Sequence, residues 1–313
     1  MNRFDNPELP EAGTTPRCGD CEEYSSSLST RRAFVVVPVE PQDESGLATK
    51  TLDHLHSAGV ASWATILFVR ADSESLTRSE LFNRGMKDAV SRGAKYVFWL
   101  RNGCLPRVGA MERLLEISRC RRAIAAVGRN FPVGHEGNRK TWFGSRIIQT
   151  NKTEISPVDW APDYCTCLPA VAIGNGFRPG IPDHWAAEDF CLSAGKRGIP
   201  CLVVGSAAVD HHSWELSRVV SKRPSWLLGD ESIFDTWKKL NRRGNMLNPK
   251  VRFRFFLSHW GFTGLVPACS PYFRLAVITI LRGIFPIAWL RKFYGNRSEA
   301  WQLQRAYRSV IKT

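Results

Sequence analysis

Short apolar runs that alternate with helix-like stretches constrain the fold of this 313-residue chain more than any other feature. The runs are rich in β-branched and aromatic residues, which favours strands buried on both faces. They occupy residues 33–39, 65–69, 95–100 and 123–127. Between them, apolar residues recur at helical spacing over residues 48–59, 78–92 and 109–118. This alternation predicts an α/β fold, in which a mostly parallel Rossmann-type sheet is flanked by helices.

The ends of the predicted strands indicate where a ligand binds. In open α/β sheets, ligands bind outside the carboxyl ends of the strands, where the strand order reverses. The loops that follow Val39, Val69 and Leu100 are therefore the first places to search for a site.

The chain divides into three parts by composition. Residues 1–32 are rich in Pro, Glu, Ser and Gly and predict a disordered N-terminal tail. Residues 33–215 contain the predicted sheet and its helices and form the expected ligand-binding domain. Residues 216–313 predict a basic, aromatic-rich, helical C-terminal extension.

Positive charge is concentrated near the C-terminus. The chain carries a formal net charge of +14, and residues 214–313 hold 18 basic and 5 acidic side chains. Such a segment suits an anionic membrane surface or nucleic acid. We favour peripheral membrane contact and expect no nucleic-acid partner, because no nucleic-acid-binding module accompanies the charge. The apolar run Leu275–Leu281 is interrupted by Arg282, which favours an interfacial or core-packed helix over a membrane span.

The cysteines indicate a reducing compartment. There are nine, an odd number, and Met1–Arg32 contains no apolar segment typical of a secretion signal. We therefore expect a cytoplasmic protein with free thiols. Cys18 and Cys21 have the spacing of zinc ligands but lack an obvious second pair, so a flexible thiol-bearing tail is the simpler interpretation.

A set of small and polar residues surrounds the third predicted strand. Asn83, Gly85 and Ala89 precede it, and Gly109 and Ala110 follow it. This arrangement resembles the segment of family 2 glycosyltransferases that runs into their acidic metal-binding loop.

Three later segments extend the resemblance over roughly residues 33–215. They are Val158-Asp159-Trp160, the acidic pair Glu188-Asp189, and the stretch that ends at His211. The resemblance implies a GT-A-like fold and an inverting transfer of sugar from a nucleoside diphosphate donor. The implied acceptor is a glycan or a lipid-linked molecule, as in rhamnosyl- and galactofuranosyltransferases that build cell-surface polysaccharides.

The acidic pair is the expected catalytic centre. An acceptor hydroxyl must lose a proton as it attacks the anomeric carbon, so a carboxylate is needed as general base. By position in the family, Asp189 is the base, Glu188 positions the acceptor, and His211 binds the metal or the diphosphate. The alternative is that the acidic pair only interacts with the helix dipole and that His211 and His212 are surface residues.

The nucleotide-sugar contacts are expected in the loops after the first three strands. The candidate residues are Pro38, Glu40, Arg70, Asp72, Arg101, Asn102 and Gly103. The chain departs from the family here, because the turn that should hold an aspartate reads Arg101-Asn102-Gly103. Arginine and glycine side chains cannot bind a hard cation. We therefore expect binding that is independent of Mn²⁺ or Mg²⁺ or only weakly dependent on it, with Arg70 and Arg101 near the phosphates. The alternative is that both arginines are solvated loop residues.

Three hypotheses about function follow. The first is a glycosyltransferase at the cytoplasmic face of a membrane. The second is a glycosyltransferase-like fold that has lost catalysis and serves as a binding or scaffold protein. The third, a nucleic-acid binder, depends on charge alone.

Overall fold

The computed structural model describes residues 32–40, 46–71, 76–131, 137–141, 144–148, 155–161, 164–211, 232, 234–235, 238 and 248–285. Cys18, Cys21, Asp72 and the predicted N-terminal tail up to residue 31 lie outside these residues.

A mixed sheet with strand order β2-β1-β3-β9-β5-β10-β4 forms the centre of the molecule, and β8 pairs with β10 beside this path. The strands are β1 (Ala33–Val39), β2 (Ala64–Arg70), β3 (Tyr96–Leu100), β4 (Cys104–Pro106), β5 (Ile124–Phe131), β8 (Ile155–Val158), β9 (Cys165–Pro169) and β10 (Cys201–His211). A separate hairpin pairs β6 (Gly137–Thr141) with β7 (Gly144–Ile148). The predicted α/β fold is confirmed.

Parallel pairing joins β1 to β2 and β3, and β5 to β10. β9 lies between β3 and β5 and is antiparallel to both. As a result β2, β1, β3, β5 and β10 all run in the same direction, and their carboxyl ends lie on the same side of the sheet. Sequence reasoning did not predict β9 or β4, which make the sheet mixed.

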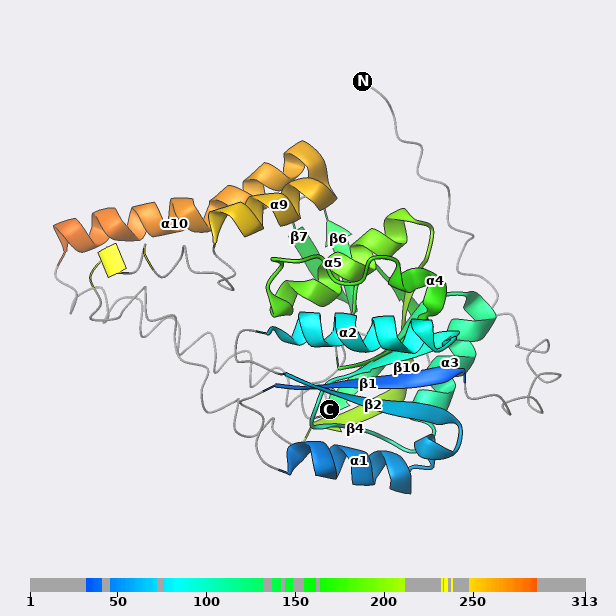
Figure 1. Cartoon of the computed structure of the whole chain (residues 1–313). Helices are drawn as coiled ribbons and strands as arrows, with labels where there is room; N and C mark the ends of the chain where they lie inside the picture. The colour runs from blue at the N-terminus through cyan, green and yellow to red at the C-terminus, as the bar shows by residue number, and fades with distance from the viewer. Residues whose placement is uncertain are drawn as a thin grey trace, which may run out of the picture.

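Helices cover both faces of the sheet (Figure 1). On one face lie α1 (Leu47–Ser57) and α3 (Ala110–Arg121), and on the other lie α2 (Arg78–Ser91), α4 (Ala170–Ile173) and α5 (Asp183–Lys196). Successive residues of a strand point to opposite faces, so Val35 and Val37 of β1 enter the α1–α3 core whereas Phe34 and Val36 enter the α2–α5 core.

The small residues of α2 explain how this helix packs. A Cβ on Gly85 would lie 2.3 Å from Val36 Cγ1 and 2.8 Å from Val69 Cγ2, so only glycine lets α2 approach β1 and β2 this closely. Two residues earlier, Asn83 Nδ2 donates to the carbonyl of Phe177 at 2.9 Å, and the amide of Phe177 donates back to Asn83 Oδ1 at 2.7 Å. The Asn83-x-Gly85 motif is thus structural, because it holds α2 against the sheet and against the loop before α5.

Two antiparallel helices, α9 (Pro249–Trp260) and α10 (Leu265–Ile284), follow after the sheet and are joined by the 3₁₀ turn η3 (Gly261–Gly264). They lie beyond α5 (Figure 1). Buried Arg252 of α9 donates from Nε to the carbonyls of Pro267 and Ala268, each at 3.1 Å. The rings of Phe253 and Tyr272 stack with centroids 6.3 Å apart. These contacts fix the first half of α10 to α9.

Candidate functional site

The carboxyl ends of β1, β2 and β3 form one edge of the sheet. In the pairing register, Val39 of β1 lies opposite Arg70 of β2. Pro38 is buried within β1, whereas Arg70 is exposed at the end of β2. Glu40, which follows β1, forms an ion pair with Arg78 at 3.7 Å.

A tight turn, Arg101–Gly103, follows β3 at this edge. The amide of Cys104 donates to the carbonyl of Arg101 at 3.0 Å, and Gly103 has a φ of 83°, which favours glycine. The amide of Arg101 donates to the carbonyl of Tyr164 at 2.9 Å, which ties the turn to the start of β9.

Asn102 anchors this turn to α1. It is buried, and its Oδ1 lies 3.1 Å from the hydroxyl of Thr51, which also accepts a hydrogen bond from the Gly103 amide at 3.1 Å. The Asn102 side chain therefore holds the turn in place from inside. Asn102 and Gly103 are buried, whereas the side chain of Arg101 is only half-buried and remains accessible to solvent.

Backbone pairing brings the end of β10 beside the turn. β4 is antiparallel to β10, and Cys104 lies opposite His211, with Leu105 opposite Asp210. The chain thus brings His211 next to the Arg101–Gly103 turn, at the edge where the nucleotide-sugar contacts are expected. Just beyond, Arg107 donates to both oxygens of Asp210, from Nε and Nη2, each at 3.0 Å.

Among the side chains that the structure describes at this edge, which do not include Asp72, the donor atoms do not suit a divalent cation. The turn supplies a guanidinium in place of a carboxylate, the Asn102 amide oxygen faces Thr51, and Asp210 is paired with Arg107. Across the described part of the chain, no group of three or more His, Cys, Asp and Glu side chains is placed to hold a metal. Hard cations require several oxygen ligands, and this set does not offer them.

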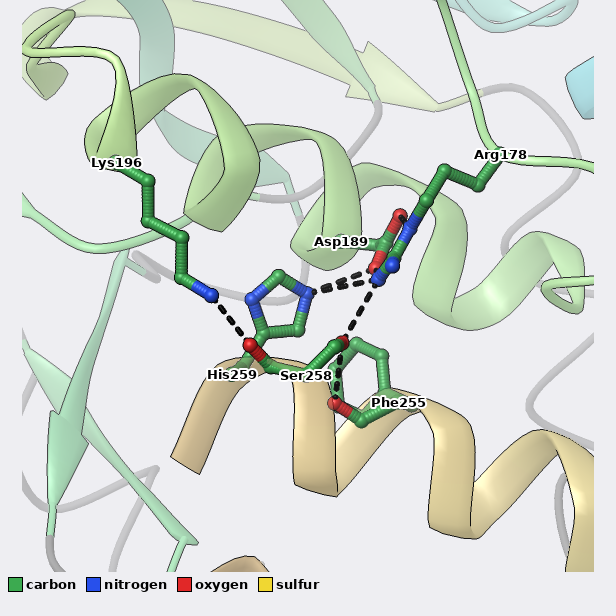
Figure 2. A network of polar contacts seen from close by, with 6 residues as sticks. All are labelled: Arg178, Asp189, Lys196, Phe255, Ser258 and His259. Atoms are coloured by element: carbon green, nitrogen blue, oxygen red, sulfur yellow. Dashed lines mark hydrogen bonds and ion pairs between the residues drawn. The ribbon is translucent and has the colours of Figure 1, made fainter. Parts of the chain in front are cut away.

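Asp189 lies at the centre of a polar network between α5 and α9 (Figure 2). Its carboxylate accepts from Arg178 at both oxygens, including a 2.6 Å bond from Nε to Oδ2, and lies 2.8 Å from His259 Nε2. Arg178 Nη2 also donates to Ser258 Oγ at 3.0 Å. Lys196 donates to the carbonyl of Ser258. The residue Asp189 is only 1% exposed.

The protonation states in this network follow from its contacts. Burial lowers the pKa of His259, and the attraction of Asp189 only partly offsets this, so the imidazole is neutral near pH 7. A carboxylate can only accept, so the 2.8 Å contact places the His259 proton on Nε2. Burial acts to raise the pKa of Asp189, but hydrogen bonds and charge from Arg178 and His259 outweigh burial and hold that pKa below its usual value.

The structure does not bring Asp189 and Asn102 together, although both were expected to serve one glycosyl-transfer site. α5 begins at Asp183, so the acidic pair lies in the second helical turn and not at the helix start. From there Asp189 faces α9, on the α2–α5 side of the sheet, whereas Asn102 contacts α1 on the opposite side. The Asp189 carboxylate is buried and is engaged by Arg178 and His259, which argues against the expected role as general base.

Glu188, the other half of the acidic pair, is in a different environment. It is half-buried, and no ion pair to it is found among the described residues. Burial raises the pKa of its carboxyl to about 7, although the indole of Trp160 acts in the opposite direction. A carboxyl with this pKa can exchange a proton near neutral pH.

Sequence reasoning missed the partners of Asp189. Arg178 is 11 residues away and His259 is 70 residues away. No spacing or motif links these positions, because α9 reaches α5 only through the tertiary fold.

Comparison with known proteins gives structural similarity alone. No family model matches the chain, and no curated protein matches its sequence. GalNAc-T7 with UDP, GalNAc and Mn²⁺ aligns over 58% of this chain with a TM-score of 0.44 and 11% identity, and the aligned part spans only 44% of that protein. The catalytic domain of Drosophila β1,4-galactosyltransferase 7 with xylobiose aligns over 68% of this chain and 81% of its own length, with a TM-score of 0.44 and 12% identity. The mannosyltransferase PcManGT from Pyrobaculum calidifontis, with GDP-Man and Mn²⁺, aligns over 90% of this chain and 86% of its own length, with a TM-score of 0.43 and 11% identity.

Proposed function

We propose that this chain is a glycosyltransferase of GT-A-like, inverting type that binds a nucleoside diphosphate sugar at the carboxyl edge of β1, β2 and β3. One observation carries the proposal. The strands on either side of β1 end at Arg70 and at the Arg101–Gly103 turn, and the pairing of β4 with β10 adds the backbone of His211 to the same edge. Two arginines therefore flank the end of β1, where ligands of open α/β sheets bind.

The arginines supply what the leaving group requires. A nucleoside diphosphate gains negative charge as its bond to the sugar breaks. A guanidinium donates to two phosphate oxygens at once and stays charged at every physiological pH, so Arg70 and Arg101 serve where related enzymes use a metal. Charge stabilisation that is independent of Mn²⁺ or Mg²⁺ follows from this set of residues.

Glu188 replaces Asp189 as our candidate for the general base. In the proposed step, the acceptor hydroxyl oxygen bonds to the anomeric carbon and its proton passes to Glu188. The bond from that carbon to the diphosphate oxygen breaks at the same time, which inverts the configuration. Asp189 accepts hydrogen bonds from Arg178 and His259. These bonds hold α5, the helix that carries Glu188, against α9.

A nucleotide-binding panel tests the proposal directly. Thermal shifts are measured with UDP, dTDP, GDP and their sugars, each with EDTA and with Mn²⁺. We expect selective stabilisation by one nucleotide that persists in EDTA. Release of nucleoside diphosphate from the matching donor should then be lost in Glu188→Gln. If no nucleotide stabilises the protein under either condition, the proposal fails.

A scaffold protein is the second candidate, and two observations favour it. The turn after β3 carries no carboxylate, and Asp189 is held in an ion pair. Nucleotide binding without turnover of any donor, in the presence of several glycan and lipid-linked acceptors, would support this alternative over catalysis.

The acceptor and location remain part of the proposal. The C-terminal extension carries most of the positive charge, with 18 basic and 5 acidic side chains over residues 214–313. We place the protein at the cytoplasmic face of an anionic membrane, where it meets a lipid-linked or nascent surface polysaccharide.

A further inference from the structure

α10 has an exposed apolar stripe along one side. The residues recur every three, four or seven positions, which places them on one helical face. They are Val266 (56% exposed), Phe273 (72%), Val277 (39%), Ile280 (60%) and Ile284 (66%). The helix has 20 residues. At 1.5 Å per residue the stripe is therefore about 30 Å long.

The opposite side of α10 is the one that packs against the protein. Ala268 and Leu275 are buried, and Tyr272 stacks on Phe253 of α9. The exposed apolar stripe is therefore a different face of α10 from the one that packs against the protein. Contiguous exposed apolar surface of this length marks an interaction site.

The charges of the α9–α10 pair indicate what covers the stripe. Between Pro249 and Ile284 the chain contains five basic residues and no acidic residue. Of these, Lys250 and Arg254 are exposed on α9, and Arg282 is half-buried in the last turn of α10. An apolar stripe accompanied only by cations complements a bilayer that has anionic headgroups.

We propose that the α10 stripe inserts into the surface of an anionic lipid bilayer, with the helix axis parallel to the membrane plane. The inference rests on α9 and α10 and not on sugar transfer. Phe273 and Ile280 are both strongly exposed and lie within the stripe, one near its middle and one near its end, and they would enter the acyl boundary.

The packing of α10 favours a helix that lies on the membrane over one that crosses it. The segment Pro249–Ile284 is long and apolar enough to cross a bilayer by composition. However, η3 reverses the chain within it, so α9 and α10 are antiparallel. Arg252 ties the first half of α10 to α9, and His259 of α9 contacts Asp189 of α5. These contacts hold the first half of α10 against α9, and the helix then extends past α9 (Figure 1).

Vesicle sedimentation tests this proposal. The full chain is mixed with vesicles of phosphatidylglycerol and phosphatidylcholine, or of phosphatidylcholine alone, at low and high salt. We expect binding to the anionic vesicles that weakens with salt. A double variant, Phe273→Asp with Ile280→Asp, should reduce this binding at least ten-fold. The matched control is Val171→Asp, which changes a 73% exposed residue of α4 and should bind as the parent does.

Several outcomes would overturn the proposal. One is equal sedimentation of the double variant and the Val171→Asp control, provided that both retain the parental melting temperature. Another is a parent chain that forms a dimer in solution and binds no vesicles, while the double variant is a monomer. That result would mean that a second copy of the chain, and not a bilayer, covers the stripe. In cell membranes, high salt or alkaline carbonate should release the chain, and resistance to both would indicate a span. Nucleotide binding without vesicles tests the proposed function separately.

Discussion

His259 Nε2 lies 2.8 Å from Asp189 Oδ1, and this contact between residues 70 positions apart joins α9 to α5. Arg178 holds the other carboxylate oxygen from the loop before α5. The helix α9 of the C-terminal extension is thereby fixed to the helix that carries the acidic pair. Asp189 therefore couples the α/β sheet domain to α9, and this role is structural.

Asp189→Asn should destabilise the protein substantially. An amide keeps the shape of the side chain but offers one acceptor oxygen and no charge to Arg178 and His259. Removal of one partner from a buried ion pair costs about 3–5 kcal/mol. We expect about 3 kcal/mol, because the Arg178 side chain is 30% exposed and regains some hydration. Urea denaturation measures the loss. Asp88→Asn, which breaks an exposed pair with Arg92, should cost less than about 1 kcal/mol.

The same network predicts sensitivity to acid. Burial holds the pKa of His259 below its ordinary value of 6.5, so the unfolded chain binds a proton there before the folded chain does. The contribution of neutral His259 to the free energy of unfolding is complete above about pH 6.5 and declines as the pH falls below that value. Asp189, whose pKa is also lowered, adds a further loss below its ordinary value of 3.8.

His259→Gln isolates the histidine part of this effect. Glutamine can still donate to Asp189 but does not titrate. Melting temperatures of the two proteins should converge as the pH falls below 6.5, because the parent loses stability there and the variant lacks this loss. Parallel curves over that range would show that His259 does not titrate differently in the folded state.

Gly85→Ala tests the packing of α2. The new methyl group would lie within 2.8 Å of both Val36 and Val69 side chains, so α2 must move or the valines must leave their rotamers. We expect a loss of about 1–3 kcal/mol in the free energy of unfolding. Gly195→Ala in α5 is the control, since no atom lies within 4 Å of the new methyl. It should raise stability by about 0.5–1 kcal/mol, as expected for alanine within a helix. A gain in Gly85→Ala equal to that in Gly195→Ala would show that α2 tolerates the methyl group.

The alternation of apolar runs with helical spacing predicted most of the sheet correctly. Ala33–Val39 became β1 with the bounds expected, because every second residue fits one of two apolar cores. β9 was missed since Cys165-Thr-Cys-Leu-Pro169 is short and carries no β-branched run, although it lies in the centre of the sheet. Its identity as a strand depends on β3 and β5, which are distant in sequence.

The grouping of the strand ends at one edge was predictable from the sequence, but the side-chain contacts were not. The parallel strands β1, β2 and β3 end at one edge and bring Arg70 and Arg101 there, whereas His211 comes beside the turn through the antiparallel pairing of β4 with β10. The burial of Asn102 against Thr51 and of Asp189 against His259 depends on where α1 and α9 pack. No local pattern in the sequence encodes these positions.

Glu188→Gln should raise stability at alkaline pH while it lowers activity. The folded-state pKa of about 7 lies above the ordinary value of 4.5, so the parent loses stability as the pH rises from 4.5 through about 7. Glutamine does not ionise, so the variant should have a higher melting temperature than the parent at pH 8. Its rate of sugar transfer should be at least 100-fold lower, as expected when a general base is removed. The parent rate should rise with pH through about 7. Higher stability with unchanged activity would remove Glu188 from the mechanism.

Arg101→Ala tests whether the turn after β3 binds phosphate. A guanidinium that donates to two phosphate oxygens makes a charge-assisted contact worth about 1.5–3 kcal/mol, so the Kd of the preferred nucleoside diphosphate should rise at least ten-fold. The nucleoside without phosphates should bind both proteins equally. Arg92→Ala is the control, because Arg92 is an exposed arginine that follows the C-terminal end of α2. This variant should bind the nucleotide as the parent does. Titration calorimetry in EDTA and in Mn²⁺ should give the same ratio between variant and parent. If Arg101→Ala weakened nucleotide binding only in the presence of Mn²⁺, the site would hold a metal ion. Arg101 would then not take the place of that ion.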